Sequence, residues 1–197
     1  QLTQLLSRTA LEVCEGQQYD VDFETRDDVT IPEYLKMIEY KTAVLVGAAL
    51  KMGALVAEAS SENAQRIYDY GRDLGIAFQL QDDYLDAFGD PKSFGKQVGG
   101  DIIENKKTFL YLTALQKLDP THSKQLQHLF SINPQDPSEK IETVKQLFID
   151  SGAAEATQQE IENYTQKALN VLETLEVPQE NKSILEDFAR LLMRRKV

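Results

Sequence analysis

The sequence predicts an all-α protein, arranged as a helical bundle. Apolar side chains recur three and four residues apart along most of the 197 residues, which is the spacing of an amphipathic helix. No segment alternates apolar and polar residues convincingly, as a half-buried strand would. Prolines and glycines interrupt the helical pattern and mark its ends. The expected helices cover residues 1–15, 31–39, 41–58, 61–88, 107–118, 122–131, 138–151, 154–175 and 181–195.

The composition narrows the class of protein. The formal net charge of −11 argues against non-specific binding to nucleic acid. Cys14 is the single cysteine, so an internal disulfide is impossible, which fits a reducing cytoplasm. Because no repeat or linker divides the chain, we expect a single all-helical domain over residues 1–197.

Helix 41–58 is predicted to be central to the fold. Lys51 is the single charged residue between positions 43 and 57, so this helix is apolar nearly all round. The stretch is too short and too rich in small residues for a membrane span, and we expect no transmembrane segment. Lys41 lies on an apolar face, so its ammonium must reach solvent or meet an anion.

Helix 61–88 carries a stripe of residues that should face the core. The stripe consists of Ala64, Ile67, Tyr68, Gly71, Leu74, Gly75 and Phe78. Gly71 and Gly75 lie one turn apart, where a helix interior normally avoids glycine, and this predicts close packing against a neighbouring helix. The stripe continues to Asp82, which we therefore expect on the inward face.

Three aspartates end this helix. Asp82, Asp83 and Asp86 fall within a stripe about 100° wide, because each helical residue advances by about 100°. Their mutual repulsion costs stability unless cations bind there. Oxygen ligands without His or Cys suit Mg²⁺, which usually completes its shell with water and phosphate. The alternative interpretation is an acidic patch on the solvent-exposed surface. A calcium-binding EF-hand loop is a poor alternative, because its order of residues is absent. The pattern favours a Mg²⁺–diphosphate site.

A glycine-bearing loop follows, between Pro91 and Thr108. Lysines stand at both ends of the loop, at Lys96 and Lys106. The order of a Walker A loop is missing. Such a loop is often a surface connection, but its position directly after the acidic helix favours phosphate capture by both lysines.

The remaining helices are expected to pack rather than to carry chemistry. His122 and His128 lack partners at ligand spacing and should lie at the surface. The basic C-terminal end is explained by the helix macrodipole. The predicted packing positions are Ile141, Val144, Phe148, Ile161, Tyr164, Ala168 and Leu172.

Taken in order, the motifs resemble those of the trans-isoprenyl diphosphate synthases, the family of farnesyl, geranylgeranyl and longer polyprenyl diphosphate synthases. The segment Glu15-Gly16-Gln17-Gln18-Tyr19-Asp20 resembles the Gly-Gln-x-x-Asp element of that family. The other motifs that carry the resemblance are Lys41-Thr42, Phe78-Gln79-x-x-Asp82-Asp83-x-x-Asp86 and Gly95-Lys96-x-x-Gly99-x-Asp101-x-x-x-x-Lys106-x-Thr108.

The resemblance implies a helical bundle of the isoprenoid synthase type and a prenyltransferase. Such an enzyme joins isopentenyl diphosphate to an allylic diphosphate through a carbocation. By the resemblance, Asp82, Asp83 and Asp86 would hold Mg²⁺. Lys41, Lys96 and Lys106 would contact the diphosphate, and Thr42 and Gln79 would hold the reacting carbocation region. A homodimer is common in the family.

The resemblance is incomplete at the N-terminus. The family carries a first aspartate-rich motif on an earlier helix, and the sequence has none before Gly16. Asp27 and Asp28 follow the Gly-Gln element and lack a third aspartate. The chain begins at Gln1 without an initiator Met. We therefore expect the C-terminal portion of a longer synthase, which alone binds diphosphate weakly and does not catalyse.

Two other functions stay open. A non-catalytic regulatory subunit of a heteromeric prenyl synthase could retain one motif, although it would have no need to bear the repulsion among the aspartates. A terpene cyclase also ionises diphosphates within an all-α cavity, but Lys41-Thr42 and the loop at Gly95-Lys96 fit the chain-elongating synthases better.

Overall fold

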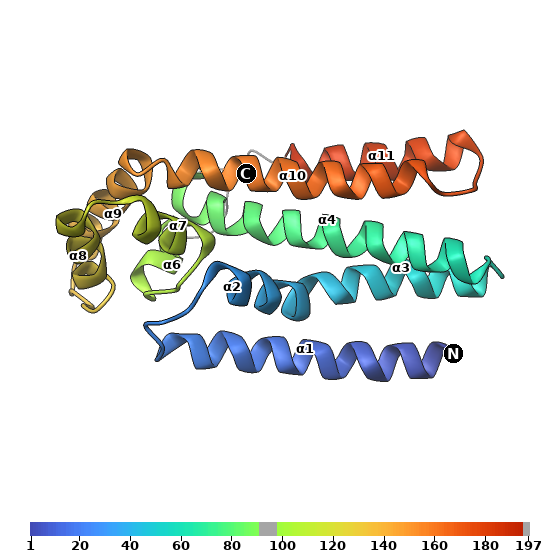
Figure 1. The fold of residues 1–197 in the computed structure, drawn as a ribbon, viewed down its shortest axis with the longest axis horizontal. Helices are drawn as coiled ribbons and strands as arrows, with labels where there is room; N and C mark the ends of the chain where they lie inside the picture. Colours follow the sequence, from blue (N-terminus) through green and yellow to red (C-terminus); the bar gives the residue numbers. More distant parts are fainter. Residues whose placement is uncertain (91–97, 195–197) are drawn as a thin grey trace. The chain divides into compact units, whose positions relative to one another are not determined.

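The computed structural model describes residues 1–90 and 98–194, which form helices joined by short connections (Figure 1). No strand occurs in these ranges, so the predicted all-α class is confirmed. Two compact units divide the chain. The first unit contains residues 1–20, 35–79 and the described part of 161–195, and the second contains residues 21–34 and the described part of 80–160.

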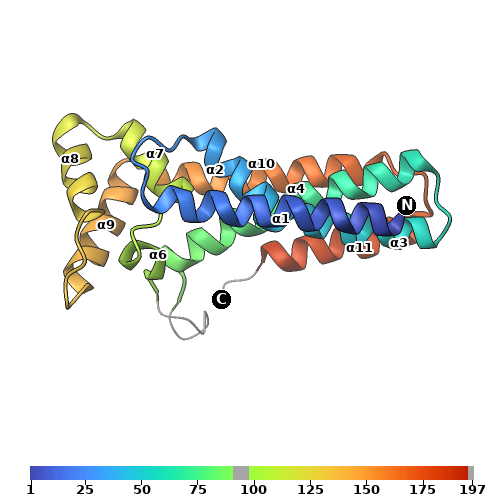
Figure 2. The same cartoon turned by 90° about the horizontal axis from the view of Figure 1, so that it is seen from below.

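Long helices make up the first unit and run alongside one another (Figures 1 and 2). Tyr70 and Leu74 belong to its core together with Ala168, Leu172 and Ala189, three small or aliphatic residues from the C-terminal helices. The helices are α1 (Leu2–Glu24), the π-helical turn η1 (Glu39–Ala43), α3 (Val44–Val56), α4 (Ser61–Phe88), α10 (Ala153–Glu173) and α11 (Gln179–Met193). The last residues of α1 and α4 and the first residues of α10 belong to the second unit.

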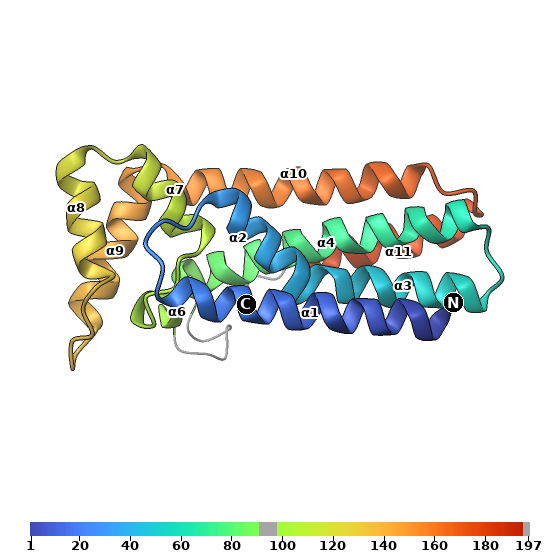
Figure 3. The same cartoon turned by 60° about the horizontal axis from the view of Figure 1, so that its bottom comes forward.

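Shorter helices make up the second unit, in which α7, α8 and α9 contact one another (Figure 3). Val144 and Phe148 are buried as predicted, whereas the short helix α6 was not predicted. Asp119 caps α8 by accepting from the amides of Thr121 and His122, which explains the start at Pro120. The helices are α6 (Gly100–Ile103), α7 (Phe109–Lys117), α8 (Pro120–Leu129) and α9 (Ser138–Asp150), while α2 (Ile31–Ile38) begins in this unit and ends in the first.

Two predicted helix boundaries are wrong. α1 continues through Gly16 to Glu24 instead of ending at residue 15. The predicted break at residue 40 is absent, because α2, η1 and α3 follow one another without a gap. A π-helical turn accommodates an extra residue within a helix without interrupting it.

The turn η1 lies unusually close to two other helices of the first unit. A Cβ atom at Gly16 of α1 would come within 2.7 Å of the carbonyl carbon of Tyr40. A Cβ atom at Gly75 of α4 would come within 2.7 Å of the Cα of Ala43. Glycine is therefore required at both positions, because no side chain fits between the backbones. This confirms the close packing predicted for Gly75, and Gly71 makes a similar approach to Gly47.

The apolar helix α3 is covered on one face by the described residues. Val44 and Ala48 are buried, but Leu45 and Val56 are 53% and 70% exposed. This helix was predicted to be central to the fold, but one of its faces is exposed in the parts of the chain that the structure describes. Among the described helices, none combines the length and apolarity needed to cross a membrane.

Replacing Gly75 by alanine should destabilise the first unit. The added methyl group would press on the backbone of η1, and overpacking of this kind costs about 1–3 kcal/mol. Gly53→Ala on α3 is the matched control, since nothing lies within 4 Å of its added Cβ and alanine favours a helix by about 1 kcal/mol over glycine. Urea unfolding would measure both changes, and equal stability of the two variants would contradict the close approach.

Candidate functional site

The three aspartates at the end of α4 differ in their environments. Asp83 is 9% exposed, whereas Asp82 and Asp86 are partly buried. Asp82 was expected on the inward face and is partly buried, but Asp83 is the more deeply buried of the two. The reason is tertiary, because Tyr34 of α2 lies against Asp83.

A buried tyrosine holds Asp83. The hydroxyl of Tyr34 donates to Oδ2 of Asp83 at 2.5 Å, and Tyr34 is 1% exposed. The centroid of its ring lies 6.3 Å from that of Phe109, so the two aromatic rings pack together within the second unit. Burial, followed by the negative charge of Asp83, raises the pKa of Tyr34 well above its usual value. The hydroxyl therefore stays protonated and continues to donate.

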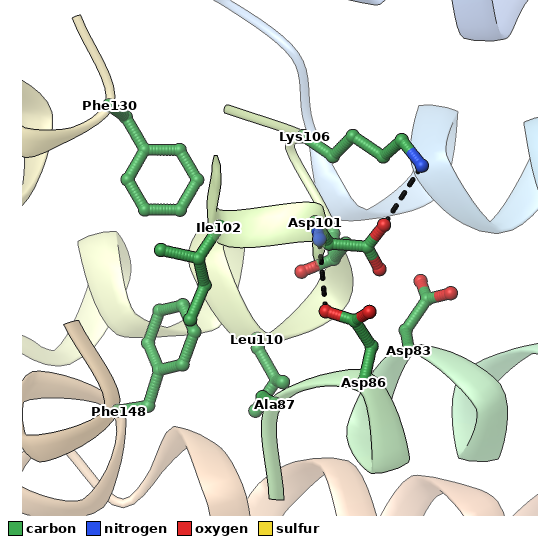
Figure 4. Close-up of a pocket in the computed structure, with 10 residues that line it drawn as sticks. Asp83, Asp86, Ala87, Asp101, Ile102, Lys106, Leu110, Phe130 and Phe148 are labelled. Atoms are coloured by element: carbon green, nitrogen blue, oxygen red, sulfur yellow. Dashed lines mark hydrogen bonds and ion pairs between the residues drawn. The ribbon is translucent and has the colours of Figure 1, made fainter. Parts of the chain in front are cut away.

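Asp86 is held by the residues that follow the loop. The backbone amide of Asp101 donates to Oδ2 of Asp86 at 2.9 Å, and the amide of Gly99 donates to its carbonyl oxygen at 2.6 Å (Figure 4). Burial, together with the charge of Asp101, raises the pKa of Asp86 to about 6. The hydrogen bonds to Asp86 therefore do not compensate fully for the burial of its negative charge.

Lys106 completes this group. Its Nζ lies 2.9 Å from Oδ1 of Asp101 and 3.0 Å from Oε2 of Glu104. Burial acts to lower the pKa of Lys106, but the hydrogen bond and charge of Asp101, followed by those of Glu104, outweigh it and raise the pKa. A lysine ammonium has three donors, so one remains for a further acceptor.

One pocket of the second unit is lined by Asp83, Asp86, Asp101 and Lys106, together with apolar residues. The free space is about 10 Å³, which is room for one water molecule or one cation rather than for a diphosphate. Figure 4 shows the carboxylates of Asp83, Asp86 and Asp101 on one side and the rings of Phe130 and Phe148 on the other.

The donor chemistry of the pocket fits a hard divalent cation. Among the described residues that line it, three carboxylates lie beside one ammonium, and carboxylate oxygens are the ligands that such a cation prefers. Within residues 1–90 and 98–194, however, no three acidic, His or Cys side chains converge closely enough to form a ready-made metal site. Bound Mg²⁺ would therefore require these side chains to turn toward a common point.

A second group of predicted site residues lies in the first unit. Lys41 and Thr42 stand on η1, and a π-helical turn often marks a functional position. Nζ of Lys41 lies 2.6 Å from Oδ2 of Asp20, so the predicted anionic partner is a side chain of the same chain. The hydroxyl of Thr42 donates to Oε1 of Gln79 at 3.1 Å, which joins two residues predicted to act together.

Two candidate residues were not assigned from the sequence alone. Asp20 ends the Gly-Gln element, and Asp101 stands in the loop motif, but spacing gives no reason to place them beside Lys41 and Asp86. Lys96 lies outside the described residues. Of the consecutive lysines after α6, Lys106 joins the carboxylates, while Lys107 donates to the carbonyl oxygens at the end of α1, at 2.8 and 3.2 Å.

Comparison with known proteins identifies the family. Residues 1–148 match the family model described as polyprenyl synthetase. The chain is 40% identical to geranylfarnesyl diphosphate synthase of Natronomonas pharaonis, over 96% of this chain and 53% of that protein.

Solved structures agree with this match. A crystal structure of a geranylgeranyl pyrophosphate synthase shares 56% identity and a TM-score of 0.94, covering 100% of this chain and 61% of the other. The geranylgeranyl pyrophosphate synthase of Corynebacterium glutamicum, complexed with isoprenyl diphosphate and magnesium, shares 29% identity and a TM-score of 0.90, covering 98% and 55%. The fold is that of the all-α isoprenyl synthases, and the chain belongs to the polyprenyl synthetase family, as its motifs predicted. It spans 53–61% of the length of these three relatives.

Replacing Tyr34 by phenylalanine should remove the hydrogen bond that its hydroxyl donates to the buried carboxylate of Asp83. The expected loss in free energy of unfolding is about 1–3 kcal/mol, which is the usual contribution of a hydrogen bond to a charged group. Tyr111→Phe is the matched control, because its ring is also buried while its hydroxyl makes no hydrogen bond among the described residues. Denaturant unfolding of both variants would test this, and a loss of the same size in each would rule out a specific contribution of the Tyr34 hydroxyl.

Proposed function

We propose that this chain forms part of a prenyltransferase that condenses isopentenyl diphosphate with an allylic diphosphate in a Mg²⁺-dependent reaction. The observation that carries the proposal is the pocket in which Asp83, Asp86 and Asp101 face Lys106. Membership in the polyprenyl synthetase family and the prenyl diphosphate synthase activities for which the relatives are named support it. The complex of the Corynebacterium glutamicum protein with isoprenyl diphosphate and magnesium gives the ligand chemistry.

In this proposal the aspartates bind the metal and the lysines bind the diphosphate. Asp82, Asp83 and Asp86 would hold Mg²⁺, which when bound neutralises charge on the diphosphate. Lys106 would use the donor that Asp101 and Glu104 leave unused, and Lys96 would act from the loop. Tyr34 would keep the carboxylate of Asp83 oriented throughout.

The reaction proposed is an ionisation followed by addition. The carbon–oxygen bond of the allylic diphosphate breaks, and the pyrophosphate leaves with the electron pair. The lysines stabilise this charge as it develops. The double bond of isopentenyl diphosphate then attacks the allylic cation, and a proton leaves to a base, which the departing pyrophosphate could supply. No nucleophilic side chain is required.

Residues of the first unit would have supporting roles. The ion pair with Asp20 would hold the ammonium of Lys41 in place and leave two of its donors for the diphosphate. Thr42 and Gln79 would present oxygen atoms, whose partial negative charge favours a nearby carbocation. Their mutual hydrogen bond would fix their orientation.

The proposal extends to the state of the whole protein. We propose that the chain is one all-helical domain of a cytoplasmic homodimeric synthase. Catalysis would need residues that this sequence does not contain, since it carries one aspartate-rich motif and spans little more than half of its relatives. The chain by itself would bind diphosphate without turnover.

Calorimetry with a non-hydrolysable allylic diphosphate would test the proposal. Binding should require Mg²⁺, and Asp83→Asn should weaken it at least ~10-fold, which corresponds to about 1.4 kcal/mol. Asp150→Asn is the control, because this aspartate is exposed at the end of α9, away from the pocket. Binding that is indifferent to Mg²⁺, or equal in the two variants, would count against the metal site.

Product analysis of the full-length protein would separate the alternatives. A longer linear diphosphate supports chain elongation, and a cyclic hydrocarbon would identify a terpene cyclase instead. Tight diphosphate binding without product unless a partner chain is added would indicate a regulatory subunit.

A further inference from the structure

A buried lysine of the second unit has no part in the function proposed above. Lys140, near the start of α9, is 3% exposed. Its Nζ donates to Oδ1 of Asn105 at 2.6 Å, to the carbonyl oxygen of Ile132 at 3.0 Å and to that of Ile103 at 3.5 Å. Among the described residues no carboxylate pairs with it. Burial accordingly lowers the pKa of Lys140.

A buried cation without a carboxylate is costly, so its contacts indicate what it holds in place. Two of the three acceptors, Ile103 and Asn105, belong to the turn that ends α6. The third belongs to the connection after α8. The ammonium thus uses all three donors to join separate segments of the chain.

Asn105 extends this junction. Its φ of +59° is left-handed, a conformation that asparagine tolerates better than most residues. Its Nδ2 donates to Oδ1 of Asn133 at 2.9 Å, while its Oδ1 accepts from Lys140. The side chain therefore connects the turn to the connection after α8 through Nδ2 and to α9 through Oδ1.

The turn is the direct link between Asp101 and Lys106. It is closed by the amide of Lys106, which donates to the carbonyl oxygen of Asp101 at 2.9 Å. The other end of the segment also rests on α9, since a Cβ atom at Gly99 would come within 3.0 Å of the Ile141 side chain. Two consecutive residues of α9 thus support both ends of the segment that carries the pocket residues.

We propose that Lys140 is a positioning residue, whose ammonium fixes the turn at residues 103–105 and thereby keeps Asp101 and Lys106 beside Asp86. The importance of that cluster rests on the function proposed above. The positioning itself can be tested independently of that function. Nζ of Lys140 also lies 5.9 Å from the ring of Phe130, which forms the apolar wall of the same pocket.

Amide hydrogen exchange on the 197-residue chain tests the positioning. The informative amides are those of Gly99, Asp101 and Lys106, whose acceptors are all within the cluster. Lys140→Met should speed their exchange at least ~10-fold relative to the amides of α7, because the turn opens locally. Exchange of the three amides that rises no more than that of α7 would overturn the proposal.

A control separates positioning from general stability. Val144→Ala removes buried methyl groups from the same helix and makes no change at the turn. It should speed the exchange of the core amides of the second unit together. If Val144→Ala selectively exposed the same three amides, Lys140 would have no special part in holding them.

A pair of variants at Asn105 decides the matter if Lys140→Met does not fold. Asn105→Gly removes the acceptor for Lys140 while its positive φ suits glycine, so the turn should open without backbone strain. Asn105→Asp also loses the hydrogen bond to Asn133 but retains Oδ1 as an acceptor for Lys140, so the three amides should exchange more slowly in it than in Asn105→Gly. Equal exchange in Asn105→Gly and Asn105→Asp would contradict the proposal.

Mg²⁺-dependent binding of methylenediphosphonate connects positioning to function. Lys140→Met should weaken this binding about 10-fold, and Val144→Ala should not, at temperatures where both are folded. If Lys140→Met exchanged the three amides faster but bound methylenediphosphonate as before, the positioning would not matter for the proposed diphosphate site. Absence of binding by the unaltered chain would refute the proposed function instead, and the exchange experiment would still decide the positioning.

Discussion

The backbone approaches that meet at η1 hold much of the first unit's candidate site together, because Gly16 and Gly75 let two helices approach the turn without intervening side chains. This approach holds the π-helical turn that carries Lys41 and Thr42. It also places Asp20 and Gln79, which share helices with the two glycines, within hydrogen-bonding distance of these residues. A side chain at either glycine would move the partners apart, so the geometry of this group depends on backbone contact.

The second unit faces a different constraint, the repulsion among its carboxylates. Each is held by the chain itself: Asp83 by the hydroxyl of Tyr34, Asp86 by the amide of Asp101, and Asp101 by the ammonium of Lys106. These donors orient the carboxylates, and burial together with the charge of Asp101 raises the pKa of Asp86. In the function proposed above, these oxygen atoms would bind a divalent cation.

Lysines of the same chain have distinct roles that their chemistry alone does not distinguish. Lys106 pairs with a carboxylate in the pocket, and Lys107 satisfies carbonyl oxygens at the end of α1. Lys140 is the most buried of the three and donates to three neutral oxygens. In the function proposed above, a phosphate ligand would use the one donor of Lys106 that Asp101 and Glu104 leave unused. The other two are engaged in holding backbone segments in place.

The sequence by itself determined the all-α class, the family and the acidic end of α4, because helical periodicity and motif order are local properties of the chain. It also identified Gly75 as a packing position, since an interior glycine is otherwise unfavourable in a helix. Tertiary structure alone decided that Asp83 is buried more deeply than Asp82, because its partner Tyr34 lies 49 positions away in the chain. It likewise decided the roles of Asp20, Asp101 and Lys140, whose partners are brought to them only when separate segments pack together.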